Sequence, residues 1–318
     1  MTRAWRVHEL GDPKDVLKLE EVEDPRAKDG ETVVEVEAAA LNFFDILMCR
    51  GEYQERPELP FSPGGEVAGT VDGRRVIATP FPAGGYSEKV VVPEDALFPI
   101  PDSLPFEEAA AMHIIFQTAY FALHHRASLR EGETVLVHAG AGGVGSAAIQ
   151  LARAAGAKVI ATAGSEEKVH VCRKLGADLA IDYREEDFIS AVKEATEGRG
   201  ADVVFDPVGG DVFDGSRRCV AFEGRIVIIG FAGGRIAQAP TNHALIKNYS
   251  VVGLHWGLYN KTKPDLVRRT HEELMRLYEA GKISPLVHSV VPFEEVPDAL
   301  ARLGGRETYG KLITTPKR

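Results

Sequence analysis

The feature that most constrains this chain is a glycine-rich segment between a predicted strand and a predicted helix. An apolar strand is expected over 134–138 and an Ala-rich helix over 143–155, with the pattern G-x-G-x-x-G between them. In this order Gly140 is expected to make the turn, Gly142 to let backbone N–H groups approach a pyrophosphate, and Gly145 to let the helix pack closely on the strand. The residues predicted to bind a dinucleotide here are Gly140, Gly142, Gly143, Val144 and Gly145. Outside this context the pattern is weak, because 32 glycines produce chance matches.

Strand and helix signals alternate around and beyond that segment. Further strands are expected over 158–162, 179–182, 202–206, 225–230 and 250–255, and further helices over 166–175, 185–195 and 212–222. Alternation of this kind is typical of βαβ units and a doubly wound parallel sheet of the Rossmann type.

The first part of the chain is rich in strand signals instead. Strands are expected over 32–38, 66–71, 75–78 and 88–92, with Asp72-Gly73 as a tight turn, followed by a helix over 107–126. The tail is expected to form helices over 265–279 and 293–303 and a short strand over 312–314, and to fold back onto the first part. We therefore predict a β-rich domain over 1–122, completed by 263–318, and a dinucleotide-binding domain over 123–262.

Composition excludes several classes of protein. The chain has 318 residues and a formal net charge of -10, which argues against a general nucleic-acid binder. Its three cysteines lie far apart, so a disulfide framework is not expected. No apolar run approaches the roughly 18 residues that a membrane-spanning helix needs, and no secretory signal is recognised. A cytoplasmic protein without nucleic-acid or membrane partners is expected.

The end of the second predicted parallel strand bears on the choice of dinucleotide. NAD sites usually have an acidic residue there that binds the ribose 2′-hydroxyl, whereas this strand ends in Ala163-Gly164-Ser165. Glu166 and Glu167 follow in the first turn of a helix that Ser165 can cap, where acidic residues suit the helix dipole. The missing carboxylate leaves room for a 2′-phosphate. Lys168 is near enough in sequence to reach it, although an ordinary solvated lysine is the alternative.

Several short stretches resemble the zeta-crystallin-like quinone oxidoreductases of the medium-chain dehydrogenase/reductase family. They are residues 40–45, 63–69, 85–88, 117–120 and 206–210 together with the glycine-rich loop. The resemblance covers nearly the whole chain. It implies a GroES-like catalytic domain, a Rossmann domain, a cleft between them for nicotinamide and substrate, NADPH as cofactor and a homodimer.

The resemblance also assigns roles to individual residues. Thr118 corresponds to the nicotinamide side of the site, and the 2′-phosphate positions correspond to Ser165, Lys168, Tyr183 and Arg306. Phe231 in the turn 230–232 and Trp256 in the stretch 254–256 correspond to loops beside ribose and nicotinamide. Asn42 and Tyr53 correspond to polar groups of the substrate pocket and are the candidate catalytic residues.

The metal ligands of the zinc-dependent relatives are missing. Asn42 stands at the position of their first cysteine ligand and Gly65 at that of their histidine, so Glu66 alone remains and no metal site is expected. Without a Lewis acid, the expected reaction is hydride transfer from NADPH to a quinone or a related conjugated carbonyl. Reduction of enones, alkenals or enoyl thioesters is the alternative activity. A non-catalytic NADPH-binding protein with a structural or sensing role is the alternative of another class.

Overall fold

The computed structural model describes residues 1–80 and 84–317, which form two compact units. Unit 1 comprises Met1–Ile114 and Pro285–Arg318, and unit 2 comprises Ile115–Ser284. The sequence placed these two divisions after residues 122 and 262, whereas the two units divide after residues 114 and 284. Segments 115–122 and 263–284 therefore belong to unit 2. They contact each other through Gln117, whose amide Nε2 donates to the carbonyl oxygen of Val267 at 2.9 Å.

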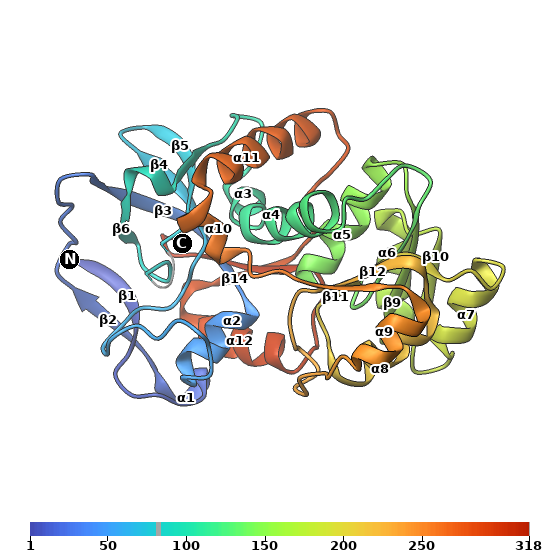
Figure 1. Ribbon diagram of the computed structural model, residues 1–318. Coiled ribbons are helices and arrows are strands. Elements are labelled where there is room, and N and C mark those ends of the chain that lie inside the picture. The colour runs from blue at the N-terminus through green and yellow to red at the C-terminus, as the bar shows by residue number, and fades with distance from the viewer. Residues whose placement is uncertain (81–83, 318) are drawn as a thin grey trace. The chain divides into compact units, whose positions relative to one another are not determined.

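Unit 1 is the β-rich part of the chain (Figure 1). Its strands are β1 (Thr2–Val7), β2 (Leu17–Val22), β3 (Glu31–Leu41), β4 (Val67–Val71), β5 (Arg74–Ala78), β6 (Lys89–Pro93), β7 (Leu97–Pro99), β14 (Val287–Pro292) and β15 (Lys311–Thr315). Its helices are α1 (Pro13–Val16), α2 (Phe43–Cys49), η1 (Glu94–Ala96), α3 (Phe106–Ala110), η3 (Phe293–Glu295) and α12 (Val296–Gly304).

The main sheet of unit 1 includes the tail of the chain, as predicted. Its strand order is β14-β15-β3-β4-β5-β7, with β6 also paired to β3. Strand β15 runs antiparallel to β3, with Leu312 opposite Leu41 and Thr314 opposite Ala39. The predicted turn at Asp72-Gly73 joins β4 to β5, and both residues have the positive φ that a two-residue hairpin turn requires. The GroES-like expectation is confirmed by this β-rich arrangement.

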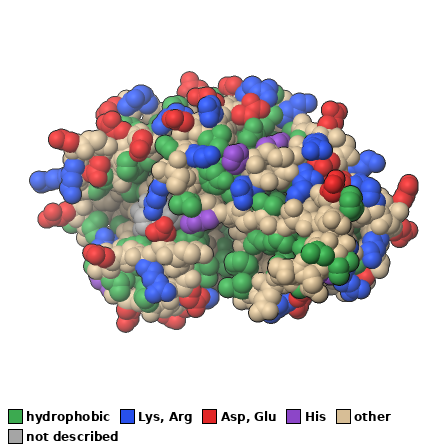
Figure 2. Space-filling model, in the orientation of Figure 1, with side chains coloured by type: hydrophobic (Ala, Val, Ile, Leu, Met, Phe, Trp, Pro, Cys, Tyr) green, Lys and Arg blue, Asp and Glu red, His purple; other side chains and the backbone are tan. Residues whose placement is uncertain are grey.

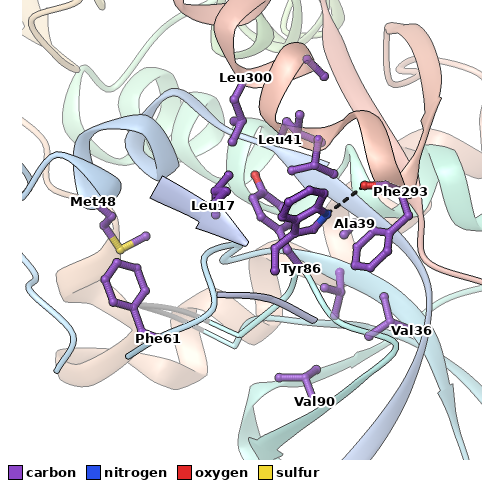
Figure 3. Close-up of a cluster of buried hydrophobic side chains, with 14 of the residues drawn as sticks. Leu17, Val36, Ala39, Leu41, Met48, Phe61, Tyr86, Val90, Phe293 and Leu300 are labelled. Carbon is purple, nitrogen blue, oxygen red and sulfur yellow. Dashed lines mark hydrogen bonds between the residues drawn. The ribbon is translucent and has the colours of Figure 1, made fainter. Parts of the chain in front are cut away.

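A continuous hydrophobic core underlies this sheet. It gathers side chains from the first and last parts of the chain, including Val36, Leu41, Tyr86, Phe293 and Leu300 (Figure 3). The dashed bond in Figure 3 runs from the indole Nε1 of Trp5 to the carbonyl oxygen of Phe293 at 2.8 Å. The tail is therefore part of the core and not an appendage.

Unit 2 alternates strands and helices. Its strands are β8 (Thr134–Val137), β9 (Lys158–Ala163), β10 (Leu179–Asp182), β11 (Ala201–Asp206), β12 (Val220–Ile228) and β13 (Ser250–Gly253). Its helices are α5 (Gly143–Ala154), α6 (Glu166–Leu175), α7 (Phe188–Ala195), α8 (Gly210–Cys219), α9 (Thr241–Lys247), α10 (Gly257–Thr262) and α11 (Pro264–Glu279). They are preceded by α4 (His113–Tyr120), which begins in unit 1 and continues into unit 2, and by η2 (Phe121–Arg126), a six-residue π-helix.

The strands of unit 2 form the predicted parallel sheet, in the order β10-β9-β8-β11-β12-β13. Helix α5 packs against α6, and α7 packs against α8. Figure 1 shows α5 and α8 on opposite sides of the sheet. The chain thus leaves β8 in one direction and returns to its other side at β11, which is the switch point of a doubly wound sheet. This confirms the fold class.

Two predicted helices differ in extent from the structure. The segment 107–126 is not one helix, because it breaks between α3 and α4 and ends as a π-helix. The segment 212–222 was predicted as a helix, whereas α8 ends at Cys219 and β12 begins at Val220. Val220 pairs with Ala201 of β11, so sheet pairing overrides the local preference there.

No helix among the described residues is long and apolar enough to span a bilayer.

The tail strand should contribute strongly to the stability of unit 1. Leu312 is fully buried in β15, whereas the side chain of Val290 in neighbouring β14 is 44% exposed. We expect Leu312→Ala to lower the free energy of unfolding by about 2–5 kcal/mol, because it leaves a cavity in the core. Val290→Ala is the matched control and should cost less than about 1 kcal/mol. Denaturant unfolding measures both, and equal losses would contradict this account of the tail.

Candidate functional site

Helix α5 begins without a side-chain cap. Its N-cap residue is Gly142, and no side chain accepts a hydrogen bond from its first turn. By contrast, Ser165 Oγ accepts from the N–H of Lys168 at the start of α6, and the Asp187 carboxylate accepts from the N–H groups of Ile189 and Ser190 at the start of α7. The first N–H groups of any helix lack intrahelical partners. At α5 no described side chain caps them, and Gly142, Gly143 and Val144 are only half-buried, so these N–H groups could bind an anion.

The glycines of this loop are needed for different reasons. A Cβ at Gly145 would lie 2.2 Å from the carbonyl oxygen of Ala139, so only glycine permits this close approach of α5 to the loop. A Cβ at Gly140 would lie 2.9 Å from both Ala161 Cβ and Cys172 Sγ. The positive φ of the turn belongs to Ala139, at 49°. At Gly142 a Cβ would meet only Ala139 oxygen, at 3.2 Å, which leaves the approach to the helix open.

A buried polar bridge supports the strand that leads into this loop. His138 follows β8, and its ring nitrogens lie 3.0 Å from Thr162 Oγ1 and 2.8 Å from Ser216 Oγ. Burial lowers the pKa of His138 to about 3, so the ring is neutral at physiological pH. The bridge joins the ends of β8 and β9 to α8 without placing a charge under the loop.

Three of the four predicted 2′-phosphate residues gather at the end of β9. Ser165 caps α6, and the side chain of Lys168 lies half-buried in the first turn of that helix. Tyr183 follows β10, and its N–H donates to the carbonyl oxygen of Ala163 at 3.1 Å. Its phenol lies so close over Gly164 that a Cβ there would be 2.5 Å from the hydroxyl oxygen. No carboxylate ends β9, and Arg306, the fourth predicted residue, belongs to unit 1.

Loops after β11 and β12 carry further predicted residues of unit 2. The Asp206 carboxylate Oδ1 accepts from the N–H groups of Val208 and Gly209, each at 2.9 Å. The N–H of Gly233 in turn donates to the carbonyl oxygen of Val208 at 2.9 Å, which ties this turn to the loop that holds Phe231. The side chains of Thr118 on α4 and Trp256 before α10 are buried, and that of Phe231 is 41% exposed. The sequence did not single out Asp206 for this positioning role.

The two candidate catalytic residues lie in unit 1. Asn42 is the N-cap residue of α2 and is buried. Tyr53 follows α2 in a loop, where its ring stacks on Phe44 with centroids 5.5 Å apart. Burial raises the pKa of Tyr53, and the nearby carboxylates of Asp45 and Glu55 raise it further, so the hydroxyl keeps its proton at neutral pH.

Buried charged groups surround Asn42, and the sequence reasoning missed them. The Asp45 carboxylate accepts from Asn42 N at 2.8 Å, Gly64 N at 3.2 Å and the Tyr86 hydroxyl at 2.6 Å. Its burial raises its pKa to about 6, against the effect of these donors. Glu66 Oε1 accepts from Ile114 N at 2.7 Å, and Glu66 Oε2 lies 3.7 Å from the Lys311 ammonium. Charged residues inside apolar stretches were the available signal, but Lys311 joins the cluster only through the pairing of β15 with β3.

Among residues 1–80 and 84–317, no group of three His, Cys, Asp or Glu side chains is arranged to hold a metal ion.

Known proteins share both units with this chain. Residues 28–102 match the alcohol dehydrogenase GroES-like domain, and residues 143–272 match the family described as zinc-binding dehydrogenase. Quinone oxidoreductase-like protein 2 homolog of Nematostella vectensis is 39% identical over 99% of this chain and 89% of its own length. Human quinone oxidoreductase is 32% identical over 98% of this chain and 97% of its own length. The chain belongs to the medium-chain dehydrogenase/reductase family, in its quinone oxidoreductase group.

A solved structure agrees with this membership. The quinone oxidoreductase of Thermus thermophilus, whose structure was also determined in complex with NADPH, is 38% identical, with a TM-score of 0.87 over 98% of this chain and 99% of its own. The resemblance noted from the sequence is therefore confirmed at the level of the family and the fold.

The glycine-rich loop permits a test that separates binding from folding. We expect Gly142→Val to fold but to bind NADPH at least about 10-fold more weakly, because its side chain occupies the approach to the open end of α5. Gly145→Val should instead destabilise unit 2, because its Cβ meets backbone that cannot move away. Fluorescence titration with NADPH and thermal unfolding separate the two effects. A folded Gly142→Val variant with unchanged affinity would show that this loop is not the dinucleotide site.

Proposed function

We propose that this protein transfers hydride from NADPH to quinones or related conjugated carbonyls without zinc. The observation that carries the proposal is the uncapped N-terminus of α5 beside a β9 end that has no carboxylate. In the quinone oxidoreductase group this combination suits a dinucleotide with a 2′-phosphate.

The residues of unit 2 fit NADPH. The first N–H groups of α5 would hold the pyrophosphate, and Ser165, Lys168 and the Tyr183 hydroxyl would surround the 2′-phosphate. Thr118, Phe231 and Trp256 would line the nicotinamide end. When bound, NADPH supplies the hydride, and the protein supplies position and electrostatics.

Two residues of unit 1 suit the substrate's chemistry. The amide Nδ2 of Asn42 donates a hydrogen bond to the substrate oxygen, where negative charge develops as the carbonyl is reduced. Tyr53 carries a protonated hydroxyl and donates the proton that the reduced oxygen needs. Reduction of a quinone needs no metal, because the negative charge that develops on its oxygen is delocalised over the ring.

The cluster around Asn42 does not suit zinc. Asn42 and Gly65 occupy the positions of two former ligands, and Glu66 already faces the ammonium group of Lys311 at 3.7 Å. A zinc ion beside that ammonium group would be repelled strongly, because charges are poorly screened in the protein interior. We infer that activity does not depend on zinc.

An acceptor screen tests substrate and metal together. Purified protein is assayed for NADPH oxidation with quinones, simple enones, alkenals and enoyl thioesters, before and after treatment with a chelator. We expect the highest kcat/KM with quinones and no loss after chelation. A higher kcat/KM with enones, alkenals or enoyl thioesters than with quinones would support the alternative activity and contradict quinone reduction. No turnover with any acceptor would support a non-catalytic NADPH-binding protein, and loss on chelation would refute zinc independence.

Cofactor preference has its own test. We expect kcat/KM to be higher with NADPH than with NADH, and Arg306→Ala to reduce the NADPH value about 10- to 150-fold, since a guanidinium–phosphate contact contributes about 1.5–3 kcal/mol. The NADH value should change little. Arg306 has a φ of 59°, which alanine tolerates no better than arginine, so the variant adds no relief of strain. Equal losses with both cofactors would exclude Arg306 from the 2′-phosphate site.

We also propose a homodimer formed through the edge of the parallel sheet. Strand β13 is an edge strand, and Val251 on it is 39% exposed. Three large hydrophobic side chains of neighbouring segments are also exposed, namely Phe222 at 69%, Leu245 at 76% and Ile246 at 71%. Figure 2 shows hydrophobic side chains gathered on the surface near α9. An exposed apolar edge of this kind invites pairing with a second copy.

Light scattering after gel filtration tests the dimer. The parent should elute with the mass of two chains, and Val251→Lys combined with Leu245→Asp should shift it toward one. Leu10→Lys is the control, because Leu10 is 53% exposed in unit 1 and should leave the mass unchanged. A monomeric parent would rule out the proposal.

A cytoplasmic setting is also proposed, because Cys49, Cys172 and Cys219 are all free buried thiols. Cell fractionation tests it.

A further inference from the structure

Lys311 is a buried lysine in the middle of the polar cluster of unit 1. It lies on β15, its residue surface is 3% exposed, and burial lowers its pKa while Glu66 and Asp45 oppose that effect. Long cationic side chains are seldom buried without a specific partner. Its partners therefore indicate what the ammonium group does.

The ammonium group makes two hydrogen bonds and one looser ion pair. It donates to the carbonyl oxygen of Leu41 at 3.0 Å and to the side-chain oxygen Oδ1 of Asn42 at 2.5 Å. Glu66 Oε2, at 3.7 Å, is beyond hydrogen-bonding distance. The shortest contact of Lys311 is thus with the candidate catalytic amide and not with the carboxylate.

This contact determines which end of the Asn42 amide points where. An ammonium group is a donor only, so it must face the oxygen of the amide and not its NH2 group. The NH2 group is consequently turned away from Lys311. Its hydrogen bond to the carbonyl oxygen of Ala40 is long, at 3.4 Å, and it also donates to the Glu66 carboxylate, so a substrate oxygen would compete with these two acceptors for Nδ2.

We propose that Lys311 is a positioning residue that fixes the Asn42 amide with its NH2 group toward the substrate oxygen. The proposal rests on the proposed function, in which Asn42 donates to that oxygen. If the amide were flipped, its oxygen would face the substrate oxygen and repel the developing negative charge. Lys311 acts through Asn42 alone and does not touch the substrate.

The backbone of Asn42 is held independently of Lys311. Asp45 accepts from the Asn42 N–H at 2.8 Å and is itself bound by Gly64 and Tyr86, so the start of α2 is fixed without the lysine. A buried ion pair such as Lys311–Glu66 is also a weak contributor to stability, because desolvation offsets the attraction. The role that remains for Lys311 is to set the orientation of the Asn42 side-chain amide.

A double-mutant cycle tests this role. Lys311→Met is combined with Glu66→Gln, so that neither charge of this ion pair is left without the other, and Glu66→Gln alone is the control, because Glu66 also contacts the Asn42 side chain. For each variant kcat and KM are measured in the parent and in the Asn42→Ala background. We expect kcat to fall about 10- to 100-fold in the parent, as for a lost charge-assisted hydrogen bond, with little change in KM for NADPH. In the Asn42→Ala background the further loss should be less than about twofold. Equal losses in both backgrounds, or an unchanged kcat, would overturn the proposal.

A second variant keeps Lys311 and Glu66 in place. Asn42→Asp preserves the shape of the side chain and its bond to Lys311, but presents an oxygen where the NH2 group stood. We expect it to lose as much kcat as Asn42→Ala. Activity near that of the parent would show that the donor is not needed.

The orientation can be measured without turnover. In the protein without added ligand, the 13C resonance of the Asn42 side-chain carbonyl should move upfield in the Lys311→Met/Glu66→Gln variant, because its hydrogen bond to the ammonium is lost. An unmoved resonance would refute the contact itself. If the contact is present but the parent reduces no acceptor, the proposed function fails and with it the catalytic role of the contact, so the two failures are distinguishable.

Discussion

The pairing of β15 with β3 is the interaction on which unit 1 depends most. It joins the end of the chain to the strand that runs directly into Asn42 and α2. The pairing buries Leu312 and Ile313 in the core and at the same time carries Lys311 to the side-chain oxygen of Asn42. One strand therefore supplies both hydrophobic stabilisation and the electrostatics of the candidate substrate-binding residue.

In unit 2 the comparable constraint is the close approach of α5 to the loop after β8. Only glycine at 145 permits it, and no side chain among the described residues caps the start of the helix at Gly142. The neighbouring helices α6 and α7 satisfy theirs internally with Ser165 and Asp187. Helix α8 also begins at a glycine without a side-chain cap, so what sets α5 apart is the missing cap together with the glycine-rich loop that follows β8.

Buried polar groups divide into two kinds in this protein. His138 bridges two hydroxyls and is kept neutral by burial, so it supports the glycine-rich loop without affecting the charge of a bound phosphate. Asp45, Glu66 and Lys311 are instead ionisable groups packed around one uncharged amide. Buried charges are costly unless each has partners, and their concentration at Asn42 marks a position where orientation matters.

Local pattern was sufficient wherever an element's own residues decide its structure. Helix α6 and strand β10 were predicted over their observed residues, because the cap Ser165, the terminating Gly176 and a short apolar run are local signals. The Asp72-Gly73 turn was predicted for the same reason, since it requires positive φ at two adjacent residues. Prediction failed at Val220, where pairing with β11 overrides the helical pattern. Strands β1, β2, β7 and β14 were not predicted.

The sequence by itself determined the family, the two kinds of domain and the position of the glycine-rich loop between β8 and α5, because glycine spacing and strand–helix alternation are short-range properties. It also placed Ser165 and Lys168 near one another, since both belong to one helix start. Only the tertiary structure decided that Tyr183 lies over Gly164, and that Lys311 reaches Asn42 from the far end of the chain. Such contacts depend on strand order and on burial, which local sequence patterns do not specify. Lys311 and Asn42 are 269 positions apart, so no local pattern predicts their hydrogen bond.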